Sequence, residues 1–393
     1  MFDSLYIAWK YVRFNKFKSV ILVTCITLIA LLPLSLELLL NESEKQLMAR
    51  AKSTPLLVGA KGSALDLAMN SLYFDDEIPE LVAMDEVNYV NETQLAMPIP
   101  LYVRFKARGY PVVGTTLDYF DYRNLELASG NSLAILGECV LGATVADQLG
   151  LKPGDSLISS PENLFDLAGV YPLKMKVAGI LQKSNTADDR AVFVDLKTAW
   201  IIQGLGHGHK DLKKNKDPTV ILKRTDTNVA ANAKLDHYNE ITRNNLDSFH
   251  FHGNLGTYPI TGLIAVPLDT KSGTLLRGRY LTRKTSNQIL KPTEVIEGLL
   301  ENIFKIKNLI DSVILFVGSA TVLAIILVFA LSLRIRQNEI LTIFKLGCRR
   351  MTIARLMGAE ICIIVLTSGF FCGGLVALID YFADDLVRTL VIR

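Results

Sequence analysis

The stretch from Ser312 to Leu333 contains no charged side chain, and it constrains the fold more than any other feature. As a helix rising about 1.5 Å per residue, it is about 33 Å long, which matches the hydrocarbon core of a bilayer. Arg334 then ends the apolar run abruptly. A polar stretch with apolar side chains at helical spacing follows, then a break at Gly347, and the chain turns hydrophobic again beyond Glu360. This order predicts two membrane helices joined by a short amphipathic helix that contacts another molecule in the cytoplasm.

Two further stretches are apolar enough to cross a bilayer. The first runs from Ser19 to Leu36, and Pro33 does not exclude a helix there because membrane helices tolerate proline. Residues 1–18 combine apolar side chains at helical spacing with lysines and arginines, which is typical of a helix lying on anionic lipid. A cleavable signal peptide is the alternative, but no small-residue cleavage site follows. The last span runs from about Ile361 to Ile379.

The distribution of charge orients these spans. Basic residues precede the first span and acidic residues follow it, which places the N-terminus in the cytoplasm. The predicted divisions are a cytoplasmic interfacial helix (1–18), transmembrane helix 1 (19–40), an extracytoplasmic domain with a helical stalk at both ends (41–305), transmembrane helix 2 (308–333), a cytoplasmic coupling helix (334–356), transmembrane helix 3 (357–380) and a short extracytoplasmic tail (381–393).

The extracytoplasmic region has the texture of an α+β domain. Short apolar bursts, such as 55–60 and 173–181, are typical of strands. Ala143–Leu149, ended by Gly150, and Asp195–Ile202 are typical of helices. We therefore expect an α-helical membrane protein of three transmembrane helices, with a large α+β extracytoplasmic domain between helices 1 and 2.

The stretches next to the first two spans have a helical pattern. Apolar residues recur at helical spacing in 294–310, and 38–52 is a plausible partner. Because each stretch directly adjoins a span, we expect a stalk of two helices that connects the bilayer to the domain. Two ordinary domain helices are the alternative.

Composition excludes several classes of function. The net charge of +3 over 393 residues comes without a long basic run, so nucleic acid is not an expected partner. Of the five cysteines, Cys139 alone lies in the extracytoplasmic region, where one thiol cannot form an internal disulfide. The sequence has no phosphate loop of the GxxxxGK[ST] form and no GxSxG or HExxH motif. The three spans lack charged residues, which argues against ion-coupled transport.

All five histidines lie between residues 207 and 252. Two pairs have the form His-x-His: His207 with His209, and His250 with His252. Because alternate residues of a strand share a face, such a pair can present two imidazoles to one metal ion. We expect His250 and His252 to be the best pair, with a third ligand from His237, His207 or His209.

A site without metal is the alternative interpretation. A fixed zinc site needs three or four ligands, and no carboxylate or cysteine spacing completes one here. Residues 204–209 adjoin four lysines and have the pattern of a basic loop, which would repel a cation. Both interpretations remain open, so zinc is the single cofactor that this chain itself could hold.

Several motifs in a consistent order resemble the MacB/FtsX/LolC-type permeases of ABC transporters. In the extracytoplasmic region they are VVGTTLDYF at 112–120, CVLGATVADQLGLKPGD at 139–155, VAGIL at 177–181 and DRAVFV at 189–194. In the cytoplasmic segment, RQNEILTIFKLG at 336–347 is similar to the coupling segment of that family. The resemblance covers nearly the whole chain.

The resemblance implies a fold, a partner and a location. LVGAKGSALDL at 57–67 looks like a branch in which permease and ATPase are separate polypeptides. ATP would therefore be bound by a partner ABC-type ATPase rather than by this chain, and the permease would pair as a homodimer or heterodimer in the lipid of the bacterial inner membrane, with its large domain in the periplasm. Family members usually have four spans, whereas three are predicted here. The ATPase-coupling residues that the resemblance implies are Arg336, Glu339, Ile340, Phe344, Leu346, Gly347, Arg349 and Arg350.

Two functions from different classes fit this resemblance. The first is a transporter permease that transmits ATP-driven motion to a periplasmic domain, which handles an extracytoplasmic or membrane-embedded substrate. The second is an FtsX-like scaffold that controls an extracytoplasmic enzyme without transport. Metal-related transport is a minor third alternative, which depends on the histidines.

Overall fold

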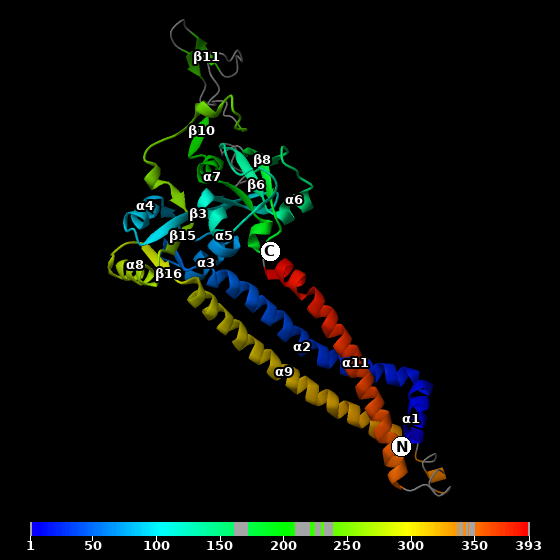
Figure 1. Ribbon diagram of the computed structural model, residues 1–393. Helices are drawn as coiled ribbons and strands as arrows, with labels where there is room; N and C mark the ends of the chain where they lie inside the picture. The colour runs from blue at the N-terminus through cyan, green and yellow to red at the C-terminus, as the bar shows by residue number, and fades with distance from the viewer. Residues whose placement is uncertain are drawn as a thin grey trace. The chain divides into compact units, whose positions relative to one another are not determined.

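The protein is described by a computed structural model of two compact units (Figure 1). We call Met48–Glu297 the sheet unit, and Met1–Leu47 with Gly298–Arg393 the helical unit. The described residues are 2–160, 172–208, 221–224, 229–231, 239–335, 337, 341–342, 345 and 350–391.

Four long or amphipathic helices account for most of the helical unit. They are α1 (Phe2–Phe14), α2 (Lys16–Lys52), α9 (Pro292–Ile335) and α11 (Arg350–Val391). Among the described residues, the segments Lys16–Lys52, Pro292–Leu327 and Ala354–Ala383 are long and apolar enough to cross a membrane. The three predicted membrane helices are thus confirmed. Helix α2 continues through Pro33, as expected. Helix α11 runs on to Val391, so it includes most of the predicted tail at 381–393.

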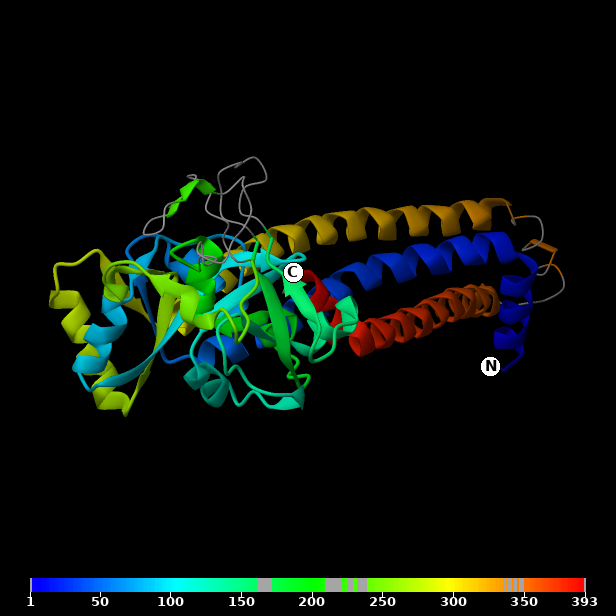
Figure 2. The ribbon, with the colours of Figure 1, turned by 90° about the horizontal axis from the view of Figure 1, so that it is seen from above.

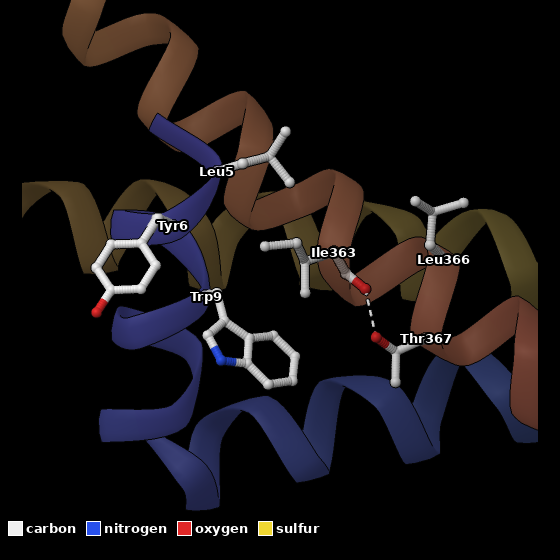
Figure 3. A pocket seen from close by; sticks show the side chains of 6 residues that line it. All are labelled: Leu5, Tyr6, Trp9, Ile363, Leu366 and Thr367. Carbon is white, nitrogen blue, oxygen red and sulfur yellow. Dashed lines mark hydrogen bonds between the residues drawn. The ribbon is translucent and has the colours of Figure 1, made fainter. Parts of the chain in front are cut away.

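Helix α1 lies across the ends of the long helices of its own unit (Figure 2). Its apolar side chains Leu5 and Trp9 face Ile363 and Thr367 of α11 around a pocket of about 480 Å³ (Figure 3). The Thr367 hydroxyl is satisfied within α11, because it donates to the carbonyl oxygen of Ile363 at 2.5 Å. The predicted interfacial helix therefore turns part of its apolar face toward another helix of the protein.

Polar contacts also join α2 to α11 in the helical unit. The Lys18 ammonium lies 3.6 Å from the buried carboxylate of Glu360. Four residues further along each helix, Leu22 of α2 and Ile364 of α11 are both buried in one hydrophobic cluster. An ion pair at the polar end and apolar packing beyond it fit helices that enter a bilayer together.

The sheet unit is built on a mixed sheet of ten strands. Its order is β16-β1-β15-β3-β4-β9-β6-β8-β5, with β7 paired to β8. The strands are β1 (Leu56–Ala60), β3 (Ala96–Ala107), β4 (Tyr110–Thr115), β5 (Leu127–Gly130), β6 (Glu138–Leu141), β7 (Ser156–Ile158), β8 (Lys174–Leu181), β9 (Val192–Asp195), β15 (Gly262–Pro267) and β16 (Asn287–Leu290). The pairs β4–β9 and β6–β8 are parallel, and the other pairs are antiparallel.

In the part of this unit that the structure describes, three two-stranded ribbons and several helices accompany the sheet. The ribbons are β2 (Val82–Ala83) with β14 (Pro259–Ile260), β10 (Gly206–Gly208) with β13 (Phe249–Phe251), and β11 (Ile221–Arg224) with β12 (Val229–Ala231). The helices are α3 (Ala64–Tyr73), α4 (Asp85–Glu92), α5 (Leu117–Arg123), α6 (Ala143–Leu149), α7 (Leu196–Gln203), α8 (Thr270–Thr282) and the 3₁₀ turns η1 (Ala187–Arg190), η2 (Leu246–Ser248) and η3 (Leu255–Thr257).

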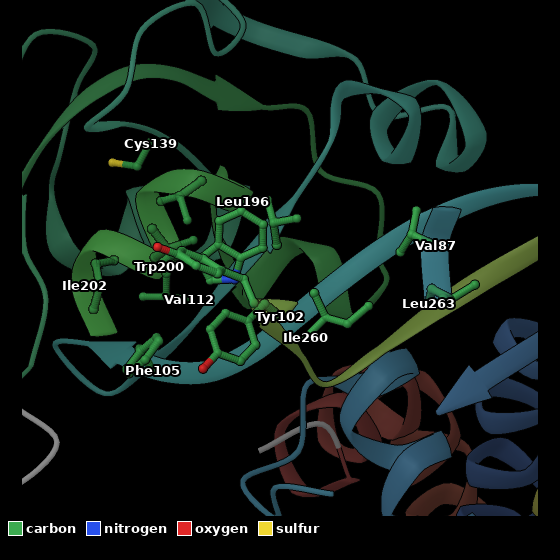
Figure 4. Close-up of a cluster of buried hydrophobic side chains, with 14 of the residues drawn as sticks. Val87, Tyr102, Phe105, Val112, Cys139, Leu196, Trp200, Ile202, Ile260 and Leu263 are labelled. Carbon is green, nitrogen blue, oxygen red and sulfur yellow. The ribbon is translucent and has the colours of Figure 1, made fainter. Parts of the chain in front are cut away.

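The sheet is covered on both faces. Leu56 and Val58 of β1 belong to a buried cluster that also contains Leu276 of α8; Figure 4 shows other members of the same cluster. The alternate residue Gly59 points to the opposite face, where a Cβ would lie 2.5 Å from the side chain of Leu67 in α3. Because successive side chains of a strand point to opposite faces, this alternation places helices on both sides of the sheet.

The helices predicted in this region form where their capping signals indicate. Helix α6 ends at Gly150, whose φ of +65° suits a residue without a Cβ. Helix α7 begins after Asp195, whose carboxylate accepts from the backbone N–H of Lys197. The predicted strands at 55–60 and 173–181 correspond to β1 and β8. The basic-loop interpretation of 204–209 is wrong for Gly206–Gly208, because these residues pair with β13.

Candidate functional site

The predicted coupling segment lies mostly outside the described residues. This applies to Arg336, Glu339, Ile340, Phe344, Leu346, Gly347 and Arg349. Arg350 is the first residue of α11, a helix that continues into the third predicted membrane span. The ATPase-coupling role of these residues stays a prediction.

The structure brings together three of the five predicted metal-ligating histidines. His207 in β10 is the direct cross-strand partner of His250 in β13. His252 follows two residues later and therefore projects to the same side of the ribbon. Among the described residues, the candidate nitrogens of these three side chains all lie within 4.8 Å of one another. His209 and His237 lie outside the described residues.

The imidazole rings are closely spaced. Nε2 of His252 lies 3.4 Å from Nε2 of His207. The ring centroid of His207 lies 5.0 Å from that of His250 and 5.1 Å from that of His252. The centroids of His250 and His252 are 4.7 Å apart. His207 is half-buried and His252 is exposed, so solvent reaches the cluster.

The opposite face of the ribbon is aromatic and anchors it to the sheet unit. Phe251 packs edge-on against Trp200 of α7, with ring centroids 6.4 Å apart, and lies 6.0 Å from Tyr258. Gly206 and Gly208 leave room for this packing, because a Cβ on Gly206 would lie 2.5 Å from the Phe251 ring. The ribbon therefore has one apolar face on the core and one histidine face toward solvent.

One hydrogen bond orients the His250 ring, and a second fixes the backbone at His252. Nδ1 of His250 lies 3.1 Å from the carbonyl oxygen of Ser248. A carbonyl only accepts, so Nδ1 carries the proton and the lone pair of the neutral ring is on Nε2. The backbone N–H of His252 donates to the Tyr258 hydroxyl at 3.1 Å. An imidazole whose Nδ1–H is held by a backbone carbonyl is oriented as metal-ligating histidines commonly are.

A second polar cluster is buried at the end of α2, inside the sheet unit. Nη1 of Arg50 donates to Oδ2 of Asp188 at 2.6 Å, and Nη2 donates to Oδ1 at 2.9 Å. The same Nη2 donates to the Tyr119 hydroxyl at 2.8 Å, and that hydroxyl donates to Oδ1 of Asp188 at 2.7 Å. All three side chains are buried, and we call this cluster the Arg50 clamp.

Further contacts strengthen the Arg50 clamp. Nε of Arg50 donates to the carbonyl oxygen of Leu72, and the guanidinium lies 5.4 Å from the ring centroid of Phe74. Burial raises the pKa of Asp188, but the charge of Arg50 and hydrogen bonds from Arg50, Tyr119 and Thr186 outweigh that effect and lower the pKa to about 2. Asp188 is therefore charged at neutral pH, and its charge is balanced by that of Arg50.

A second arginine forms hydrogen bonds next to the Arg50 clamp. The guanidinium of Arg123 in α5 donates to the hydroxyls of Ser53, at 2.9 Å, and Thr54, at 2.8 Å. These two residues directly follow α2. The end of the helix is thus fastened to the sheet unit from two sides.

The Arg50 clamp was not predicted from the sequence, although two of its residues lie in or beside motifs that carry the family resemblance. Tyr119 is part of VVGTTLDYF, and Asp188 directly precedes DRAVFV. Arg50 resembles any other charge in a polar helical stretch. Because 138 positions separate Arg50 from Asp188, no local spacing signals the pair. An arginine in the last turn before a strand, with no acidic partner three or four residues away, is the only hint.

A comparison with family models decides which family includes this chain. The model of the MacB-like periplasmic core domain matches residues 38–238. The chain belongs to this family. The matched range contains the whole Arg50 clamp and His207, whereas His250 and His252 lie beyond it. The resemblance to MacB/FtsX/LolC-type permeases is thereby confirmed.

Solved structures with similar chains have low identity. The extracellular domain of the ABC-type transporter YknZ from Gram-positive bacteria is 10% identical, with a TM-score of 0.32, over 60% of this chain and 98% of that one. The periplasmic region of MacB from Actinobacillus actinomycetemcomitans is 12% identical, with a TM-score of 0.33, over 65% and 98%. A domain of a putative permease protein from Porphyromonas gingivalis is 11% identical, with a TM-score of 0.26, over 54% and 76%. No curated protein matches the chain.

Proposed function

We propose that this chain is the permease subunit of an ABC transporter and transmits the ATP-driven motion of a separate ATPase to its MacB-like domain. The ATPase would contact the segment 336–350, and the helices α2 and α9 would carry its movement. The domain would handle a substrate outside the cytoplasm or within the membrane. Membership of the MacB-like family and three helices able to span a membrane support this proposal.

The Arg50 clamp is the observation that carries the proposal furthest. A helix can transmit force only if its end is fixed in the body that has to move. Residues 48–52 of α2 belong to the sheet unit, and Arg50 there is locked by a bidentate ion pair to Asp188. Bidentate arginine–carboxylate pairs fix orientation as well as distance. Rotation or translation of α2 would therefore move the sheet unit with it.

The start of α9 is fixed in a comparable way. The side chain of Ile296 is fully buried within the sheet unit. The carboxylate of Glu294 in the first turn pairs with Arg277 of α8 at 3.4 Å and with Lys291 at 3.6 Å. Apolar burial supplies most of this attachment, because exposed ion pairs contribute little. Both helices that join the sheet unit to predicted membrane spans are thus anchored in its core.

The scaffold alternative uses the same mechanical parts. In that case α2 and α9 would control an enzyme bound to the MacB-like domain, and no substrate would be moved. ATPase activity that rises with a transported substrate supports the permease, whereas activity that responds only to a bound enzyme supports the scaffold. A homodimer or a heterodimer of permeases fits either function.

The test changes the proposed ATPase contact. Phe344 offers an apolar side chain between basic flanks in the coupling segment, as expected of a helix that docks in a groove. In Phe344→Asp a charge would be buried in that joint without a partner. We expect the partner ATPase, co-expressed with the permease, to be lost on purification or to lose its coupled activity. The permease itself should still insert in the membrane.

The matched control is Thr352→Asp, which adds the same charge just outside the segment 336–350, at an exposed position of α11. We expect this variant to retain the ATPase. If Phe344→Asp retains the ATPase in normal amount and with normal activity, the segment is not the coupling site and the proposal fails.

A further inference from the structure

We propose that His207, His250 and His252 form a binding site for one divalent transition-metal ion on the sheet unit, with zinc as the ion that fits best. The proposal goes beyond the permease function and does not depend on it. It rests on the spacing of the three imidazoles, on their orientation and on the support of the ribbon that carries them.

The spacing agrees with tetrahedral coordination. Zinc binds imidazole nitrogen at about 2.0–2.1 Å, so two nitrogens at a tetrahedral angle lie about 3.3–3.4 Å apart. Nε2 of His207 and Nε2 of His252 are 3.4 Å apart. The candidate nitrogen of the third imidazole, His250, lies within 4.8 Å of the other two, a gap that small side-chain rotations can close. Imidazole ligands suit zinc, copper and nickel, and not the oxygen-seeking calcium or magnesium.

The ribbon places the ligands without help from a metal. Cross-strand pairing sets His207 opposite His250, and Phe251 on the reverse face packs against Trp200 of the core. The Tyr258 hydroxyl accepts a hydrogen bond from the backbone N–H of His252 and so fixes the chain at this ligand. Ligands on a strand pair supported by packed aromatic rings need little reorganisation to bind. Chance surface histidines would not combine this support with a common face.

The arrangement is that of an open site rather than a structural one. Structural zinc sites present four protein ligands, whereas sites with three keep a position for water or for an incoming ligand. Among the described residues, this group consists of the three histidines, and His252 is exposed. A metal held in this way can be exchanged with a donor or acceptor in solution. The site therefore suits a domain that receives or passes on zinc outside the cytoplasm.

The experiment titrates the full-length chain with zinc. The protein is purified in detergent without a polyhistidine tag, stripped with a chelator, and titrated with Zn²⁺ by calorimetry in the absence of any ATPase. We expect one equivalent of zinc per chain. Cobalt(II) in its place should produce the visible absorption of tetrahedral coordination. Replacing a ligand in His250→Ala should weaken zinc binding by at least about 100-fold, the upper end of what loss of a supporting contact costs.

The controls separate the site from the other histidines. The double variant His209→Ala with His237→Ala removes the two histidines outside the described residues, and we expect it to keep one equivalent of zinc. The triple variant of His207, His250 and His252 to alanine should bind none while melting at the same temperature as the unaltered chain without metal. Binding that survives the triple variant, or that is absent from the unaltered chain, overturns the proposal. Because no ATPase takes part, either result leaves the permease function untouched.

Discussion

The guanidinium of Arg50 is a buried charge, and contacts with its neighbours offset the free energy that its removal from water costs. Asp188 accepts two of its hydrogen bonds, and the Leu72 carbonyl and the Tyr119 hydroxyl accept others. Buried ion pairs gain little over well-packed apolar side chains, but the loss of one partner is costly, because the other charge remains buried. The stability that Arg50 provides therefore depends on Asp188 staying in place.

A pair of variants measures this dependence. Arg50→Ala should lower the free energy of unfolding of the sheet unit by about 3–5 kcal/mol, because it leaves the Asp188 carboxylate buried and unpaired. The double variant Arg50→Met with Asp188→Leu removes both charges and should recover most of that loss. Pulse proteolysis of the full-length chain across a urea series reports the stability of both variants. A double variant that is less stable than Arg50→Ala would show that the ion pair does more than balance two charges.

At the scale of an element, the β10–β13 ribbon depends on its glycines. A Cβ at Gly206 would lie 2.5 Å from the Phe251 ring, so Gly206→Ala must push the ring away from Trp200 and tilt the strand that carries the histidines. We expect this variant to weaken zinc binding by about tenfold, as loss of ligand support does, although it removes no ligand. Zinc titration of the full-length chain measures the effect.

The control for this prediction is Gly62→Ala. Nothing lies within 4 Å of a Cβ built at Gly62, so this variant should bind zinc as the unaltered chain does. Equal affinity in Gly206→Ala and Gly62→Ala would mean that the aromatic face does not position the histidines.

Helices and strands with local sequence signals could be predicted, whereas the pairing between distant strands could not. Helix α6 could be predicted because Gly150 and the turn after it are local signals, and β8 because its apolar pattern is local. The strand β10 has only three residues, two of them glycine, so its own sequence predicts a loop. It is a strand because β13, some 40 residues away, supplies its hydrogen bonds. For the same reason His207 could be named as a ligand but not selected over His209 or His237.

At the scale of the whole molecule, the charge asymmetry predicts on which side of the membrane each unit lies. Cys139 is unsuitable as a reporter of this, because it is fully buried and burial raises the pKa of its thiol to about 12. Exposed positions serve better. In a chain whose cysteines are replaced by alanine, Lys152→Cys should react with an impermeant thiol reagent added outside intact inner membrane, and Lys16→Cys should not.

The two positions control for each other in this experiment. Disruption of the membrane should make both react to a similar extent, since both side chains are exposed. Labelling of Lys16→Cys from outside an intact membrane would reverse the predicted topology.

The order of strands in the sheet also determines when the sheet unit can form during synthesis. β1 is the first strand to leave the ribosome, yet it lies between β15 and β16, the last two. Leu57 pairs with Ile264 and Leu290, so roughly 200 residues must follow before either partner exists. At about 5–20 residues per second this delay is about 10–40 s. The apolar strand β1 therefore stays without its sheet partners for that time, and the sheet can close only after β15 and β16 have been made.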